Sequence, residues 1–199
     1  MKYSNRIRTI TGLGLLTALV ALLQYLGGFI RFGVFSISLV LIPIVIGAAL
    51  YGPWAGAWLG LVFSGMVFAT GDANTFLAIN IPGTIITVIV KGVLAGLCAG
   101  LVYRWIAQKN DILATFAAAA VCPIVNTGIF LLGCRLFFYD TVRAWGEAAG
   151  FENAFVYMMV GFVGLNFLVE LAFNLVLSPA VVRLVKLIRM RRERRGASV

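Results

Sequence analysis

Residues 82–106 read PGTIITVIVKGVLAGLCAGLVYRWI, an apolar run that carries one lysine near its middle. An α-helix rises ~1.5 Å per residue, so about 20 such residues cross the hydrocarbon core of a bilayer. Lys91 shares one helical face with Asn80, Thr84 and Thr87, because their spacing fits 3.6 residues per turn. A cation in hydrocarbon costs at least ~2.5 kcal/mol and normally faces a partner, a cavity or a ligand. This polar stripe therefore predicts a binding site within a membrane-spanning helix.

The whole chain has the composition of an integral membrane protein. Of its 199 residues, 62% are hydrophobic and 12% are charged, whereas soluble domains carry about 25% charged residues. The apolar runs predict an all-α bundle of six transmembrane helices with short connections. The expected spans are Ile10–Phe29, Ile37–Leu50, Pro53–Ala69, Pro82–Ile106, Leu113–Phe138 and Ala154–Leu187. We expect one membrane domain over residues 1–188 and a basic cytoplasmic tail over residues 189–199.

The distribution of basic residues predicts the orientation of the chain. With the N-terminus inside, 12 basic residues lie at the expected cytoplasmic ends of the spans, and only Arg31, Arg135 and Arg143 lie opposite. Because cytoplasmic loops are enriched in Lys and Arg, both termini are predicted to be cytoplasmic in a multi-pass protein of the cell membrane. The basic tail is suited to membrane lipids with anionic head groups. No folded basic domain favours a nucleic-acid partner.

Several classes of chemistry lack their motifs in this sequence. The chain has no GxxxxGK[ST] phosphate loop, no GxSxG or HExxH motif and no histidine, and its three cysteines are scattered in apolar segments. We therefore expect no enzyme activity, no catalytic residues, no metal and no cofactor.

Small residues recur four positions apart in three of the predicted spans, a spacing that lets helices approach closely in lipid. For the third and fourth spans we favour packing within the bundle, through Gly56, Gly60 and Ser64 and through Gly92, Gly96 and Gly100. In the first span, a docking face for another membrane subunit competes with bundle packing, and its residues are Gly14, Thr17, Ala18 and Ala21.

Further polar residues lie in the fifth and sixth spans, and they leave two interpretations open. Glu170 could form an ion pair with Lys91 that holds the bundle together. Alternatively, a pocket opens outward, and Lys91 or Arg135 pairs with an anionic group of a solute, with Asn126 nearby. The polar loops 27–36, 70–82 and 140–153 would flank this mouth as lids, with apolar cover from Phe35, Phe76 and Tyr139.

Residues 31–60, RFGVFSISLVLIPIVIGAALYGPWAGAWLG, resemble the substrate-binding S component of energy-coupling factor (ECF) vitamin transporters. The matching features are an outer loop that ends in Phe35-Ser36-Ile37-Ser38, then Ile42-Pro43, and a turn at Tyr51-Gly52-Pro53. The resemblance continues through residues 80–83, Lys91-Gly92 and residues 122–128, and it covers the whole chain.

This resemblance implies a subunit that captures a water-soluble vitamin outside the cell and topples in the membrane to carry it inward. Its partners would be a transmembrane coupling subunit, which docks on the first helix, and two ATPase subunits. Among the vitamins of the family, pantothenate suits the polar stripe best, because it has one carboxylate, an amide and two hydroxyl groups. Lys91 or Arg135 would pair with the carboxylate, and the amide and hydroxyl groups would bind Asn80, Thr84, Thr87 and Asn126.

Folate and riboflavin are the alternative vitamins. Two other functions compete with the S-component interpretation, namely a self-sufficient secondary transporter and a membrane scaffold that transports nothing.

Overall fold

The computed structural model describes residues 2–27, 31–32, 35–36 and 39–196. Within these residues the chain is almost entirely helical, apart from a small antiparallel hairpin that pairs Arg31 with Ser36 and Phe32 with Phe35. The elements in order are α1 (Lys2–Gly27), β1 (Arg31–Phe32), β2 (Phe35–Ser36), α2 (Leu41–Tyr51), α3 (Pro53–Ala69), α4 (Asn74–Leu77), α5 (Ile81–Ile106), α6 (Asp111–Phe137), α7 (Tyr139–Ala148), α8 (Ala154–Val156), the π-helix η1 (Tyr157–Phe162) and α9 (Gly164–Gly196).

The predicted all-α membrane fold is confirmed in its general form. Four helices are long and apolar enough to cross a membrane, and their candidate spans are Ile7–Gly27, Ile81–Ile106, Asp111–Phe137 and Phe167–Ile188. The apolar helices α2 and α3 are shorter, with 11 and 17 residues. They are separated at Gly52, whose φ of 96° favours glycine, and Pro53 begins α3. The count of six spans remains a prediction.

The predicted sixth span is not one helix. The run expected over Ala154–Leu187 contains α8, the π-helix η1 and then α9. At the break, the Val163 amide donates to the Met158 carbonyl at 3.2 Å, a bond that spans five residues instead of four. Gly161 and Gly164 flank this position, and their weak helix propensity allows the wider turn. Helix α9 then continues to Gly196, past the predicted domain boundary at residue 188.

The centre of the bundle is a close crossing of α3 and α5. A Cβ added to Gly60 would overlap the carbonyl group of Gly92, and one added to Gly56 would overlap that of Gly96. Beside this crossing, the hydroxyl of Ser64 donates to the Val88 carbonyl at 2.7 Å. The predicted packing of the two small-residue motifs within the bundle is therefore confirmed, and the motifs pack against each other.

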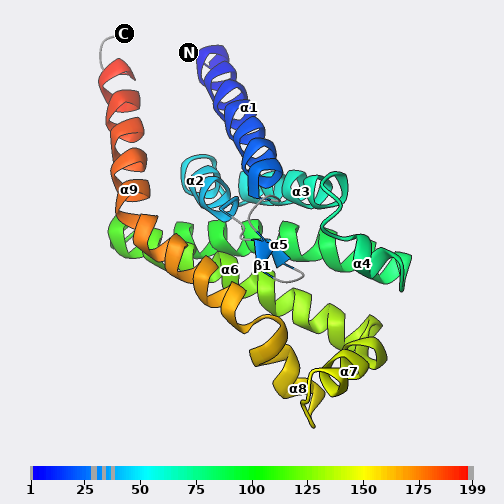
Figure 1. Ribbon diagram of the computed structural model, residues 1–199. Coiled ribbons are helices and arrows are strands. Elements are labelled where there is room, and N and C mark those ends of the chain that lie inside the picture. The colour runs from blue at the N-terminus through cyan, green and yellow to red at the C-terminus, as the bar shows by residue number, and fades with distance from the viewer. Residues whose placement is uncertain (1, 28–30, 33–34, 37–38, 197–199) are drawn as a thin grey trace.

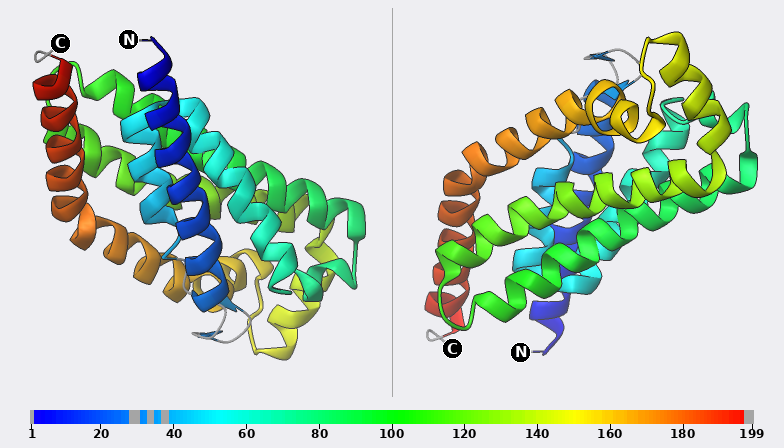
Figure 2. Two further views of the ribbon diagram at one scale, coloured as in Figure 1. Left: turned by 90° about the horizontal axis from the view of Figure 1, so that it is seen from above. Right: turned by 90° about the horizontal axis from the view of Figure 1, so that it is seen from below.

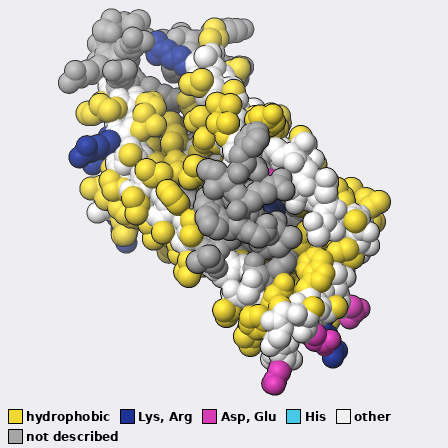
Figure 3. Space-filling model, in the orientation of Figure 1, with side chains coloured by type: hydrophobic (Ala, Val, Ile, Leu, Met, Phe, Trp, Pro, Cys, Tyr) yellow, Lys and Arg dark blue, Asp and Glu magenta, His cyan; other side chains and the backbone are white. Residues whose placement is uncertain are grey.

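The two ends of the chain lie on the same side of the bundle. Helix α1 begins, and helix α9 ends, at the end of the molecule opposite α7 and α8 (Figures 1 and 2). Figure 3 shows acidic side chains gathered near α7 and α8, where Asp140, Glu147 and Glu152 are exposed. This separation of charge fits the predicted orientation with cytoplasmic termini, which remains a prediction.

Candidate functional site

A cavity lies among α3, α4, α5, α6 and α9, towards the end of the bundle that carries α7 and α8. Its volume is about 90 Å³. A single water molecule needs a cavity of ~10–15 Å³, so this one has room for several waters or a small solute. Five of the residues predicted to bind substrate line it, namely Phe76, Thr84, Thr87, Lys91 and Asn126.

Lys91 enters the cavity from α5 between two aromatic rings. Its Nζ lies 5.7 Å from the ring centroid of Phe63 on α3 and 5.2 Å from that of Phe130 on α6. Both distances are in the range of cation–π attraction. In the described part of the chain, no carboxylate oxygen lies within 4.0 Å of this Nζ. The structure therefore does not form the direct Lys91–Glu170 ion pair, and the ammonium group retains its hydrogen-bond donors for a ligand.

Two buried polar atoms at the cavity have unsatisfied hydrogen-bonding capacity. Thr87 is 4% exposed and Asn126 is 6% exposed. Neither the Thr87 Oγ1 nor the Asn126 Oδ1 has a hydrogen-bond partner within the described residues. Because a buried polar group without a partner costs ~1–3 kcal/mol, these atoms favour a ligand that bonds to them.

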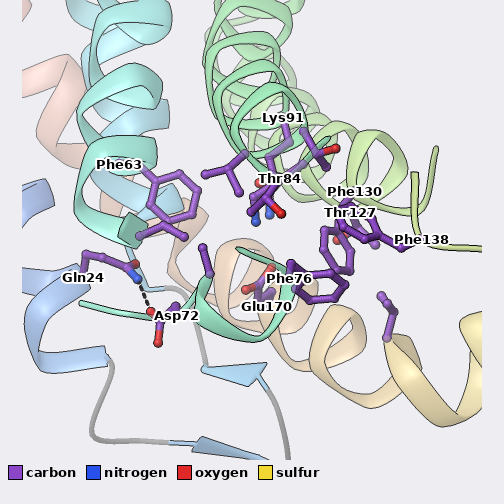
Figure 4. A pocket seen from close by; sticks show the side chains of 16 residues that line it. Gln24, Phe63, Asp72, Phe76, Thr84, Lys91, Thr127, Phe130, Phe138 and Glu170 are labelled. Atoms are coloured by element: carbon purple, nitrogen blue, oxygen red, sulfur yellow. Dashed lines mark hydrogen bonds between the residues drawn. The ribbon is translucent and has the colours of Figure 1, made fainter. Parts of the chain in front are cut away.

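Carboxylates lie on another side of the same cavity. Glu170 of α9 is only 3% exposed, and Asp72 follows α3 in the turn towards α4. The Asp72 Oδ2 accepts from the Nε2 of Gln24 on α1 at 2.7 Å and from the Thr70 hydroxyl at 3.0 Å. Figure 4 shows the bond between Gln24 and Asp72 and, across the cavity from Lys91, the carboxylate of Glu170.

Aromatic side chains cover the cavity where α4 meets α6 and α7. The ring of Phe76 lies 5.0 Å from that of Phe138, 5.5 Å from that of Phe130 and 6.1 Å from that of Trp145. All three pairs have the edge-to-face arrangement that aromatic quadrupoles favour. Phe76 therefore lies at the centre of this aromatic cluster, and its role as an apolar lid remains a prediction.

Other predicted binding residues lie outside the lining of this cavity. Asn80 is the N-cap of α5, and its side chain accepts from the Gly83 amide at 2.9 Å. Arg135 is exposed, with its guanidinium carbon 4.2 Å from the ring centroid of Tyr139, which is also not in the lining. The side chain of Phe35 lies outside the described residues.

The predicted docking residues of α1 face in two directions. Gly14 and Ala18 are exposed, and no atom lies within 4 Å of a Cβ built on Gly14. Thr17 and Ala21 are half-buried, and the Thr17 hydroxyl accepts from the Trp58 indole nitrogen at 3.1 Å. Two of the four predicted docking residues, Gly14 and Ala18, are therefore exposed, and the other two are partly covered.

The sequence did not single out several residues of the lining, including Gln24, Phe63, Phe130 and Phe138. The position of Gln24 could have been predicted, because a polar side chain within an apolar run is typical of a position that faces protein. The phenylalanines could not have been predicted to line a cavity, since they are as common against lipid.

A bundle of apolar helices around a cavity lined by polar, charged and aromatic side chains is typical of a membrane protein that binds a small solute. The model of one protein family, described as "ECF transporter, substrate-specific component", matches residues 8–182, and the chain belongs to this family. No curated protein matches the chain, and no solved structure does. Family membership makes the chain a membrane-embedded substrate-binding subunit and implies association with the coupling and ATPase subunits of an ECF transporter.

Proposed function

We propose that this S component captures pantothenate outside the cell and delivers it inward, together with a transmembrane coupling subunit and two ATPase subunits. The observation that carries the proposal is Lys91, whose ammonium enters the cavity between two rings and forms no ion pair with a described carboxylate. A solute carboxylate at this position would gain a charge-assisted hydrogen bond from the Lys91 ammonium.

The remaining groups of pantothenate suit the rest of the cavity. Its amide and two hydroxyl groups are donors and acceptors that would satisfy the Thr87 hydroxyl and the Asn126 side-chain oxygen. Thr84 donates to the Asn80 carbonyl at 2.7 Å, and its oxygen can still accept from the solute. Riboflavin offers no carboxylate for Lys91. Folate needs a larger slot than pantothenate does, although the phenylalanines of the lining would suit its rings. Both remain the alternative vitamins.

The exposed strip of α1 around Gly14 and Ala18 is the surface that we assign to the coupling subunit. Small residues on this strip would allow a partner helix to approach closely, as packing in lipid requires. The same helix contributes Gln24 to the cavity wall through its bond to Asp72. Docking and binding would thus involve two separate parts of one helix.

The proposal is tested by isothermal titration of the detergent-purified protein with pantothenate, folate and riboflavin. We expect one-to-one binding of pantothenate and at least tenfold weaker binding by Lys91→Met, because loss of a buried charge partner costs ~2–5 kcal/mol. Lys109→Met, at an exposed site between α5 and α6, is the matched control and should bind as wild type does. A folded Lys91→Met protein with wild-type affinity would remove Lys91 from the site.

A second assay separates the proposal from the secondary-transporter alternative. The protein alone, in liposomes with only an ion gradient, should not accumulate pantothenate, because an S component depends on ATP hydrolysis by its partners. Accumulation under these conditions would favour a self-sufficient carrier.

A further inference from the structure

We propose that Glu170 contacts the solute and selects for hydroxyl or amine donors at the end of the solute that is remote from its carboxylate. This inference rests on the proposed function, since it assumes that Lys91 holds a carboxylate in the same cavity. It adds a second specificity-determining residue, on a different helix. The expected ligand has a carboxylate at one end and hydrogen-bond donors at the other.

The first observation is the arrangement of charge around the cavity. Lys91 and Thr84 enter from α5, whereas Glu170 lies across the cavity on α9, with Asp72 on that side as well (Figure 4). The separation of Lys91 from Glu170 leaves space between a positive and a negative wall. A solute that fills this space meets both walls at once.

The second observation is an excess of negative over positive charge at the cavity. Two carboxylates and the Asn126 side-chain oxygen face a lining whose only cation is Lys91 among the described residues. The Asp72 carboxylate already accepts from Gln24 and Thr70. A carboxylate has about four acceptor sites, so Glu170 can accept from a solute in addition to the interaction it already makes.

Because Glu170 is buried, its negative charge depends on hydrogen-bond donors from the protein or from a solute. Its side chain is 3% exposed, so water does not solvate it as it would on the surface. Buried charges need several hydrogen bonds to offset their loss of hydration. A solute with only a carboxylate and an alkyl tail would present no further donor to Glu170 and none to the Asn126 side-chain oxygen. A solute with hydroxyl or amine donors at that end satisfies them.

An electrostatic alternative gives Glu170 no contact with the solute. In that case Glu170 only balances the charge of Lys91 from a distance. Removing its charge would then strengthen the attraction between Lys91 and an anionic solute, so the affinity would rise. The proposed contact requires the affinity to fall, and the two interpretations therefore predict changes of opposite sign.

The experiment is titration of wild type and Glu170→Gln with two probes, pantothenate and a pantothenate analogue without its two hydroxyl groups. Hydrogen bonds to a charged group correspond to about a tenfold or larger effect, so Glu170→Gln should bind pantothenate at least tenfold more weakly. For the analogue, which still carries its carboxylate but offers no donor to Glu170, the variant should bind as tightly as wild type or more tightly. Ser178→Ala is the control, because Ser178 is buried two turns further along α9, outside the cavity, and should bind as wild type does.

The outcomes separate this inference from the proposed function. If wild type binds pantothenate and Glu170→Gln binds it equally or more tightly, the inference is overturned and the proposed function stands. If Glu170→Gln does not fold, the two probes are titrated with Glu170→Asp, which keeps the charge and withdraws the carboxylate: a larger loss of affinity for pantothenate than for the analogue supports the inference, and equal changes for both probes overturn it. A wild-type protein that binds no vitamin of the panel overturns both.

Discussion

The crossing of α3 and α5 allows one perturbation to be worked out from the structure. In Gly60→Ala, the new Cβ would overlap the Gly92 carbonyl oxygen and lie 2.6 Å from the carbonyl carbon. Carbon atoms pack at ~3.5–4.0 Å, so the two helices must separate by about 1 Å. Both obstructing atoms belong to the backbone, and no change of rotamer relieves the overlap.

The expected cost follows from this separation. A gap of ~0.5–1 Å removes a quarter to a half of the dispersion attraction along the crossing, and overpacking of a core costs ~1–3 kcal/mol. Gly65→Ala is the matched control, because Gly65 is exposed on the same helix and no atom lies within 4 Å of its added Cβ. Both variants gain the same helix propensity, so their difference isolates the crossing.

The assay is thermal unfolding of the two purified variants in one detergent. For a chain of this size, ~1–3 kcal/mol corresponds to a midpoint for Gly60→Ala about 2–12 °C below that of Gly65→Ala. Equal midpoints would refute the reasoning, because they would mean that the two backbones are not in contact.

Three further predictions concern the surface and the wall of the cavity. Ala18→Trp should abolish co-purification with the coupling subunit and leave solute binding intact, whereas Leu132→Trp, at an exposed site of α6, should affect neither. Unchanged co-purification of Ala18→Trp would contradict the assignment of the α1 surface to the coupling subunit. Gln24→Leu should lower the free energy of unfolding by ~1.5–3 kcal/mol in chemical denaturation, because it removes the 2.7 Å bond to the Asp72 carboxylate; a loss below about 0.5 kcal/mol would contradict this role. Phe76→Ala should cost ~3–5 kcal/mol in the same assay, since three rings lose their contact with it, and a variant as stable as wild type would show that the aromatic cover does not pack as described.

The central helices could be predicted closely from the sequence. The bounds of α3 match the prediction, and those of α5 differ by one residue at the start, because Pro53 and Pro82 mark where each helix begins. The break before α9 was missed, since the run around Val163 is apolar throughout and hydropathy does not distinguish a π-turn from a regular one.

The candidate site could be predicted where one helix carries it. Thr84, Thr87 and Lys91 share a face of α5 because of helical periodicity alone. Arg135 was predicted to share the pocket with Asn126 as an alternative to Lys91, but nine residues are about two and a half turns, so the two side chains leave α6 on opposite sides. The contribution of Gln24 depends on how α1 packs, and no local pattern encodes that.

At the glycine crossing, different residues determine the spacing of the helices and the chemistry of the cavity. Phe63 lies three residues beyond Gly60, and Lys91 directly precedes Gly92, so the lining of the cavity begins within one turn of the crossing on both helices. Backbone contact at the glycines sets the spacing of the helices, and the side chains beside them set the chemistry. Ligand preference can therefore diverge in evolution, or be redesigned, by exchange of lining side chains while the glycines that hold the frame stay fixed.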